Sequence, residues 1–237
     1  IRKIYMKDIT QIRKLSLWIF IVPFIGVNLC LLISVNYSIF ENTIFIVDQI
    51  GRSKFTIPYI DGSLSISRAS RTYPQYLIFK PAMFLTSALL IFYWHKTNSL
   101  IQRFQQTEKN FVFKYFGIAS AILLFIHAIF LGIEFDSKII KFLRRVILLG
   151  FIISEITAQA SLIFNFYKIK RNIIDYYNHR ILILKTILVS ILILVAILSI
   201  PILNEENNVH FKHWLEWNYF IGVILFYLFT YYFWKKE

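Results

Sequence analysis

The stretch LSLWIFIVPFIGVNLCLLISVNYSIF, residues 15–40, decides the class of the fold. It carries no acidic or basic side chain and exceeds the roughly 20 apolar residues that cross a bilayer as a helix. A secretory signal would have a shorter apolar segment followed by a small-residue cleavage pattern, which we do not find after this stretch. We therefore predict that residues 15–40 form a retained first membrane span.

Five more apolar stretches follow, and together they predict an all-α integral membrane bundle of six transmembrane helices. Hydrophobic residues make up 57% of the chain and charged residues only 16%, which is below the usual share in soluble domains. The tryptophans fall near the predicted span ends, where their amphipathic rings favour the headgroup layer. The bundle is expected to be one domain over residues 1–237, with spans at about 15–40, 75–96, 114–133, 143–167, 181–203 and 214–234.

The distribution of positive charge predicts the orientation and the partners. The net charge is +13, and the Lys and Arg residues flank the apolar stretches rather than forming one basic face. This arrangement favours anionic membrane lipids as partners and argues against nucleic acid. More of these residues lie on the side of the two termini, so both termini are expected in the cytoplasm. The first loop would then face the outside of the cell or a lumen.

The first loop contains the longest polar, turn-rich interval, TIPYIDGSLSISRASRTYP at residues 56–74. Its Asp61, Ser63, Arg68 and Arg71, together with Glu216 at the start of the last span, form a candidate binding site for a phospholipid headgroup. Arginine binds phosphate through a planar fork, and hydroxyl groups add neutral donors. The alternative is structural: the arginines would pair with Asp61 or Glu216 and fold an ordered loop onto the bundle.

Three polar residues in the fourth span form a second candidate group. Glu155 and Gln159 are four residues apart on one helix face, and Arg144 lies three turns before Glu155 on the same face. An ionisable group at this depth should face the bundle interior. The group is either a polar track that descends from the outer surface or a hydrogen-bonded Glu that holds helices together.

Metal and enzyme sites receive little support. His210, His213 and Glu216 follow one another at intervals of three, so on a helix they would fan out instead of converging. They are weak metal candidates, and no cofactor is expected. Nucleophile-elbow, zinc-protease and nucleotide-binding glycine motifs are not found in the sequence, so we expect no catalysis.

Two motifs resemble the Frag1/DRAM/Sfk1 family of six-span membrane proteins. One is PYIDGS at residues 58–63 in the first loop, and the other is the pair Glu216-Trp217 ahead of the aromatic run NYFIGVILFYLFTYYFW. The position of the long loop and the expected cytoplasmic termini also agree with this family. The resemblance implies a role in lipid remodelling, lipid distribution or membrane signalling.

The sequence thus leads to one main function and two alternatives. The main hypothesis is a multi-pass protein that binds or senses phospholipid headgroups in lipid handling or remodelling, without catalysis. The first alternative is an accessory structural subunit whose apolar exterior packs against other membrane proteins. The weaker alternative is a lipid-modifying enzyme that uses Glu155 or the group of His210, His213 and Glu216.

Overall fold

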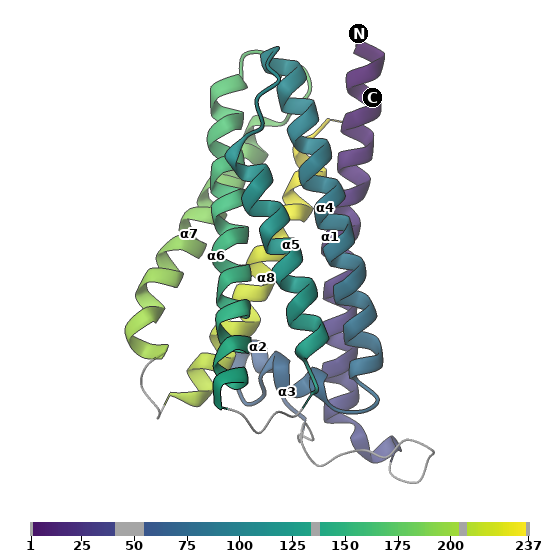
Figure 1. Cartoon of the computed structure of the whole chain (residues 1–237), viewed down its shortest axis with the longest axis vertical. Coiled ribbons are helices and arrows are strands. Elements are labelled where there is room, and N and C mark those ends of the chain that lie inside the picture. The colour runs from purple at the N-terminus through teal and green to yellow at the C-terminus, as the bar shows by residue number, and fades with distance from the viewer. Residues whose placement is uncertain (1, 41–54, 134–137, 204–207, 236–237) are drawn as a thin grey trace.

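The computed structural model describes residues 2–40, 55–133, 138–203 and 208–235. Within these ranges the chain is helical, and its only β-type pairing is an isolated bridge between Tyr177 and Trp234. Six long helices run between the two ends of the bundle (Figure 1): α1 (Arg2–Val35), α4 (Tyr76–Gln105), α5 (Val112–Phe130), α6 (Lys138–Ile169), α7 (His179–Leu203) and α8 (Val209–Phe233). Three short helices precede α4: η1 (Tyr37–Phe40), α2 (Pro58–Asp61) and α3 (Ile66–Arg71).

Five of the long helices are long and apolar enough to cross a membrane. These segments are Tyr5–Val35, Tyr76–Gln105, Val112–Phe130, Phe142–Ile169 and His179–Ser199. The all-helical character predicted from the sequence is confirmed for the described residues, and the five candidate spans agree with a multi-pass protein. The sixth span, in α8, stays a prediction, because this helix is not among the five candidate membrane spans of the described chain. The first part of the predicted long loop, residues 41–54, lies outside the described residues.

The first helix differs from its predicted bounds at both ends. It begins at Arg2, thirteen residues earlier than expected, because Ile9 and Ile12 continue a buried stripe through the basic N-terminal segment. It ends at Val35, where the side chain and the backbone N–H of Asn36 both donate to the Leu32 carbonyl. The predicted stretch overlaps the candidate span Tyr5–Val35, but apolar composition could not show where the helix begins and ends.

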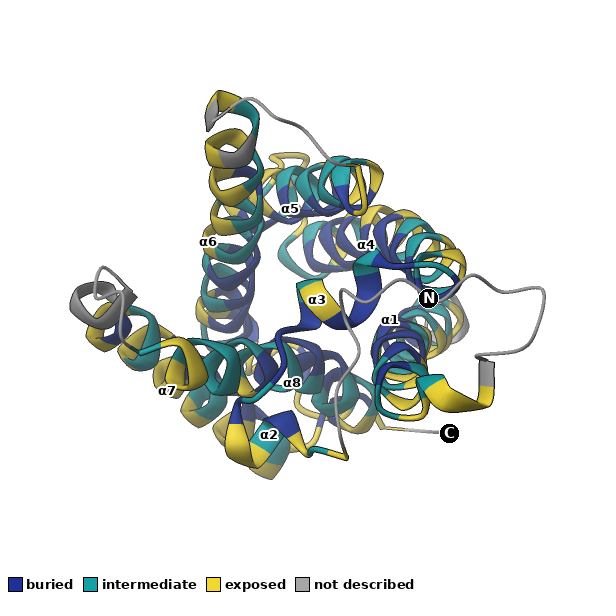
Figure 2. Ribbon diagram, turned by 90° about the horizontal axis from the view of Figure 1, so that it is seen from below, coloured by how far each residue is buried: buried dark blue, intermediate teal, exposed yellow. Residues whose placement is uncertain are grey.

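Both termini lie at one end of the bundle, which we call the terminus end. Tyr5 packs against Phe104 and Tyr176, with ring centroids 4.6 and 6.2 Å apart, and the Lys235 backbone N–H donates to the Tyr176 carbonyl at 2.8 Å. At the other end, the loop end, α3 lies across the helix ends between α1, α4 and α8 (Figure 2). Helix α7 packs against α6 and α8 at the margin of the bundle.

Helices α4 and α5 make a close contact at Gly117. A Cβ atom built on Gly117 would lie 2.3 Å from ring atoms of Trp94, which is fully buried. Trp94 packs edge-on against Tyr93 and Tyr227, so its ring cannot move aside without disturbing α8. Glycine at this position lets the two helices approach closely enough to enclose the indole.

We expect Gly117→Ala to destabilise the protein by about 1–3 kcal/mol, because overpacking of a filled core strains its neighbours. Gly150→Ala is the matched control, since its new methyl group would meet only the flexible end of Leu123 at 3.2 Å. Thermal unfolding of the purified variants in detergent measures both. Equal unfolding temperatures for the two variants would contradict the tight contact.

Candidate functional site

The polar interval of the first loop forms a compact cap at the loop end, which we define as residues 55–75. Pro58 occupies the first position of α2, where its missing N–H is not needed. Gly62 ends this helix in the left-handed conformation, with φ 60°, and its N–H donates to the Pro58 carbonyl at 3.1 Å. A Cβ atom there would lie 1.9 Å from the His210 carbonyl oxygen, so glycine is required both for the turn and for the contact with α8.

Asp61 organises the turn that leads out of α2. Its carboxylate accepts hydrogen bonds from the Thr56 hydroxyl at 2.6 Å, from the Ser63 backbone N–H at 2.9 Å and from the Ile57 N–H at 3.2 Å. Slight desolvation raises the pKa of Asp61, but these hydrogen bonds outweigh it and lower the pKa to about 2. The carboxylate is therefore ionised at neutral pH and is used to hold the cap together.

Helix α3 is held at its N-terminus by two acceptors. The Ser65 hydroxyl accepts from the Arg68 backbone N–H at 3.1 Å, as an N-cap residue does. The Glu216 carboxyl group of α8 lies against the backbone N–H groups of Ile66 and Ser67. A carboxylate against the first amides of a helix satisfies donors that have no partner within that helix. Glu216 thus fastens the cap to the bundle.

Three further side chains of α8 dock the cap through its backbone carbonyls. The buried Trp217 indole donates to Leu64 at 2.7 Å, Asn218 donates to Tyr59 at 2.9 Å, and the His213 Nδ1 lies 3.0 Å from the Gly62 oxygen. Burial, together with the nearby Arg68 and His210, lowers the pKa of His213, although the Gly62 contact opposes this shift. Since a carbonyl only accepts, the neutral ring carries its proton on Nδ1.

The two predicted arginines have different surroundings. The half-buried Arg71 folds back on its own helix, and its guanidinium donates to the Ser67 hydroxyl at 2.8 Å and to the Ser67 carbonyl at 3.2 Å. It also lies close enough to Glu216 to interact electrostatically. Arg68 is exposed, and within the described ranges its side chain forms no hydrogen bond or ion pair. Asp61, Ser63, Arg71 and Glu216 therefore order the cap, and Arg68 is the predicted residue that is left to meet a ligand.

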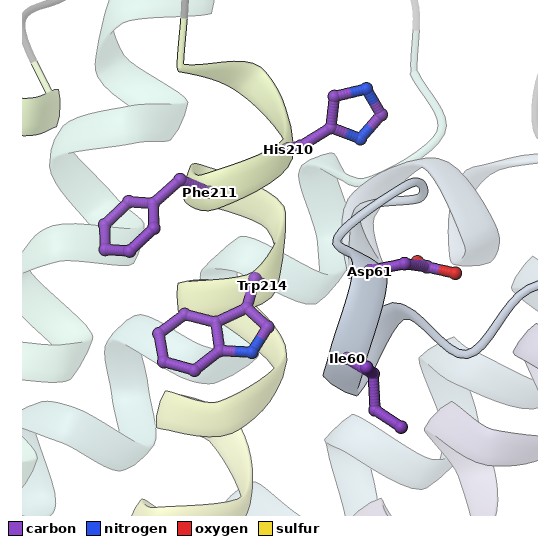
Figure 3. Close-up of a pocket in the computed structure, with 5 residues that line it drawn as sticks. All are labelled: Ile60, Asp61, His210, Phe211 and Trp214. Atoms are coloured by element: carbon purple, nitrogen blue, oxygen red, sulfur yellow. The ribbon is translucent and has the colours of Figure 1, made fainter.

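A shallow hollow of about 360 Å³ lies between the cap and α8 and is lined by Ile60, Asp61, His210, Phe211 and Trp214. Figure 3 shows Phe211 and Trp214 on one side of α8, whereas the Asp61 carboxylate points away from them. The polar groups that line the hollow therefore do not converge on a common point.

The described chain brings no three His, Cys, Asp or Glu side chains together as a metal site requires. This holds for His210, His213 and Glu216 as well.

The predicted polar pair of the fourth span lies at the centre of a buried network. Glu155 accepts from the Ser120 hydroxyl at 2.6 Å, from the Gln159 amide at 3.0 Å and from the Tyr227 hydroxyl. Gln159 also donates to the Val223 carbonyl at 3.2 Å. These bonds join α5, α6 and α8, which is the arrangement expected of a Glu that holds helices together.

Arg144 does not join this network. It lies half-exposed near the loop end of α6, and the same face between it and Glu155 carries Leu148 and Phe151. Apolar side chains thus separate Arg144 from the buried carboxylate. The three residues share a helix face, as the sequence indicated, but they do not form a continuous polar track.

The structure also reveals a buried lysine that could not be assigned a partner from the sequence. Lys185 of α7 is fully buried, and its amine donates to the Thr230 hydroxyl at 2.7 Å. The amine lies 3.9 Å from the ring centroid of Phe226 and within about 5 Å of two other phenylalanine rings. The available signal was a lone lysine inside the run ILILKTILVSILILV at residues 181–195.

Together these features define a multi-pass helical bundle of the membrane-protein type with a docked polar cap. Comparison of the chain with protein-family models, with curated proteins and with solved structures found no match. The resemblance to the Frag1/DRAM/Sfk1 family therefore rests on its two short motifs and stays a prediction.

We expect Glu155→Gln to destabilise the bundle by about 1–3 kcal/mol, because an amide nitrogen would replace an oxygen that faces donors. Tyr227→Phe should cost about 1 kcal/mol, and the double variant less than the sum, since the two residues share one hydrogen bond. Thr157→Val is the control, because that hydroxyl bonds only its own helix. Unfolding of Glu155→Gln at the wild-type temperature would contradict a structural role for the network.

Proposed function

We propose that this multi-pass membrane protein binds anionic phospholipid headgroups at its cap, without catalysis. The observation that carries the proposal is the surface composition of the cap. Phe55 is 83% exposed and Ile60 is 75% exposed, and Ile57 is exposed as well, while Arg68 extends from the same cap. Large apolar side chains beside a free guanidinium are typical of elements that lie in the headgroup layer.

The fixed position of the cap supports this role. Backbone and side-chain bonds to α8 hold it at the loop end, and the Tyr59 hydroxyl donates to Asn28 of α1 at 3.0 Å. Because the cap is already ordered, it loses little conformational entropy when a ligand binds. Helix α3, which carries Arg68, packs against α1 and α4 near the ends of their candidate spans, so we expect Arg68 at the depth of lipid phosphates.

The contacts of the acidic and histidine side chains at the cap also bear on catalysis. The Asp61 carboxylate accepts from backbone N–H groups of the turn, Glu216 lies against the backbone amides of α3, and the His213 ring contacts the Gly62 carbonyl. A general acid or base must reach a substrate atom with its proton-transferring group. These side chains instead satisfy the cap's own backbone, which favours binding over chemistry.

We expect Arg68→Ala to lower the amount of anionic phospholipid that co-purifies with the protein, relative to zwitterionic lipid, by several-fold. The lost interaction is a charge-assisted contact with phosphate. Lipid mass spectrometry of protein purified in mild detergent measures the ratio. Arg145→Ala is the matched control, because Arg145 is an exposed arginine near the loop end but outside the cap. Equal retention by both variants would reject the site.

A second candidate function, an accessory subunit of a larger membrane complex, is favoured by α7. This helix has 22% of its membrane window buried, against 33–39% for the other four, and exposes Ile187, Ile191 and Leu194 along its outer face. We expect an accessory subunit to retain other chains in native mass spectrometry, and Ile187→Ala/Ile191→Ala to release them. A stable monomer in mild detergent would count against this role.

A further inference from the structure

We propose a second anion site at the terminus end of the bundle, opposite the cap, that binds a phosphate-bearing headgroup. The site is a hollow of about 770 Å³ between the turn that joins α6 to α7 and the segment that follows α8. Four cations line it, together with a histidine and an asparagine: Lys170, Arg171, Asn178, His179, Arg180 and Lys235. This inference goes beyond the proposed function, since none of these residues belongs to the cap.

The hollow has a rigid framework. The α6–α7 turn pairs with the C-terminal segment through an antiparallel bridge between Tyr177 and Trp234. The Asn178 backbone N–H donates to Phe233 and the Lys235 N–H donates to Tyr176, each at 2.8 Å. Tyr177 and Trp234 are 6% and 1% exposed. The cations therefore extend from a backbone that is held by hydrogen bonds and by the buried side chains of Tyr177 and Trp234.

The four cations of the hollow form no ion pair within the described chain, and the acidic residue of the same turn, Asp175, lies outside the lining. The lining includes no Asp or Glu side chain, and no described residue forms an ion pair with Lys170, Arg171, Arg180 or Lys235. Four like charges in one concavity repel one another and raise the local concentration of anions. A bound anion would remove this repulsion.

The start of α7 adds to the positive potential. This helix has 25 residues and begins at His179, beside the hollow. Its first backbone N–H groups carry partial positive charge, which favours a phosphate at this end. Asn178 accepts from the Arg180 N–H at 3.0 Å and so satisfies one of these donors, while its amide nitrogen remains a donor for a ligand.

Size and depth indicate a phosphorylated lipid headgroup. A hollow of about 770 Å³ lies within the range of pockets that hold small molecules, roughly 300–1,000 Å³, and exceeds what one phosphate needs. The membrane window of α7 begins at His179, so the hollow lies at the boundary between span and headgroups. Ile174 at its rim is 64% exposed and offers an apolar contact toward the membrane. Basic pockets of this kind between helices bind anionic headgroups.

The test compares Arg171→Gln/Arg180→Gln with the control Lys7→Gln/Lys109→Gln. Both variants remove two exposed cations from the terminus end, but Lys7 and Lys109 lie outside the hollow. Each protein is placed in nanodiscs of phosphatidylcholine with or without phosphatidylinositol bisphosphate, and binding is followed by intrinsic tryptophan fluorescence, since Trp234 pairs with Tyr177 of the lining. Soluble inositol trisphosphate and inorganic phosphate are titrated into the phosphatidylcholine discs.

We expect the hollow variant to bind roughly tenfold more weakly than wild type or worse, because two charge-assisted contacts are lost. The control should bind like wild type, and both variants should unfold at the wild-type temperature. A response to the phosphorylated lipid alone supports a headgroup site, and an equal response to the soluble inositol phosphate assigns the site to a soluble anion. Equal affinity of the two variants for every probe, or no response from wild type, would overturn the proposal. Arg68→Ala should leave this binding unchanged, so the two sites are tested independently.

Discussion

A polar group that is buried among apolar helices must find a partner there, and this constraint governs the core of the protein. Glu155 meets it with donors from α5, α6 and α8, so one carboxylate links three helices at the same level. Removing a donor would leave a buried acceptor unsatisfied, which costs more than the bond contributes when it is made. The network therefore specifies the relative register of these helices. The enclosed indole of Trp94 near Gly117 adds a second restriction, between α4 and α5.

The same constraint explains the cap. The short helices and turns of the cap leave some backbone carbonyls without a partner in their own segment, and α8 supplies side-chain donors for them. Trp217, Asn218 and His213 each bond one cap carbonyl, and Glu216 takes the free amides of α3. The polar residues at the start of α8 thus have a structural task. The helix that carries them, α8, is not among the five candidate membrane spans of the described chain.

Charge is organised differently at the two ends. At the loop end, the contacts of Asp61, Arg71 and Glu216 lie within the cap, whereas Arg68 is exposed. At the terminus end, four cations surround one hollow, and none has an acidic partner in the described chain. These four basic side chains add to the Lys and Arg residues that flank the apolar stretches elsewhere in the sequence.

The sequence by itself determined the helical, multi-pass class, the approximate positions of the apolar helices and the importance of Glu155, Gln159 and Glu216. Apolar run length and helical spacing are local properties, and they suffice for these conclusions. Only the tertiary structure shows that Asp61 and Arg71 form their hydrogen bonds within the cap. It also shows that apolar residues separate Arg144 from Glu155, and that Lys185 lies among phenylalanine rings. It also brought residues 170–180 and Lys235 together. These outcomes depend on which distant segments lie side by side, and one-dimensional spacing carries no information about that.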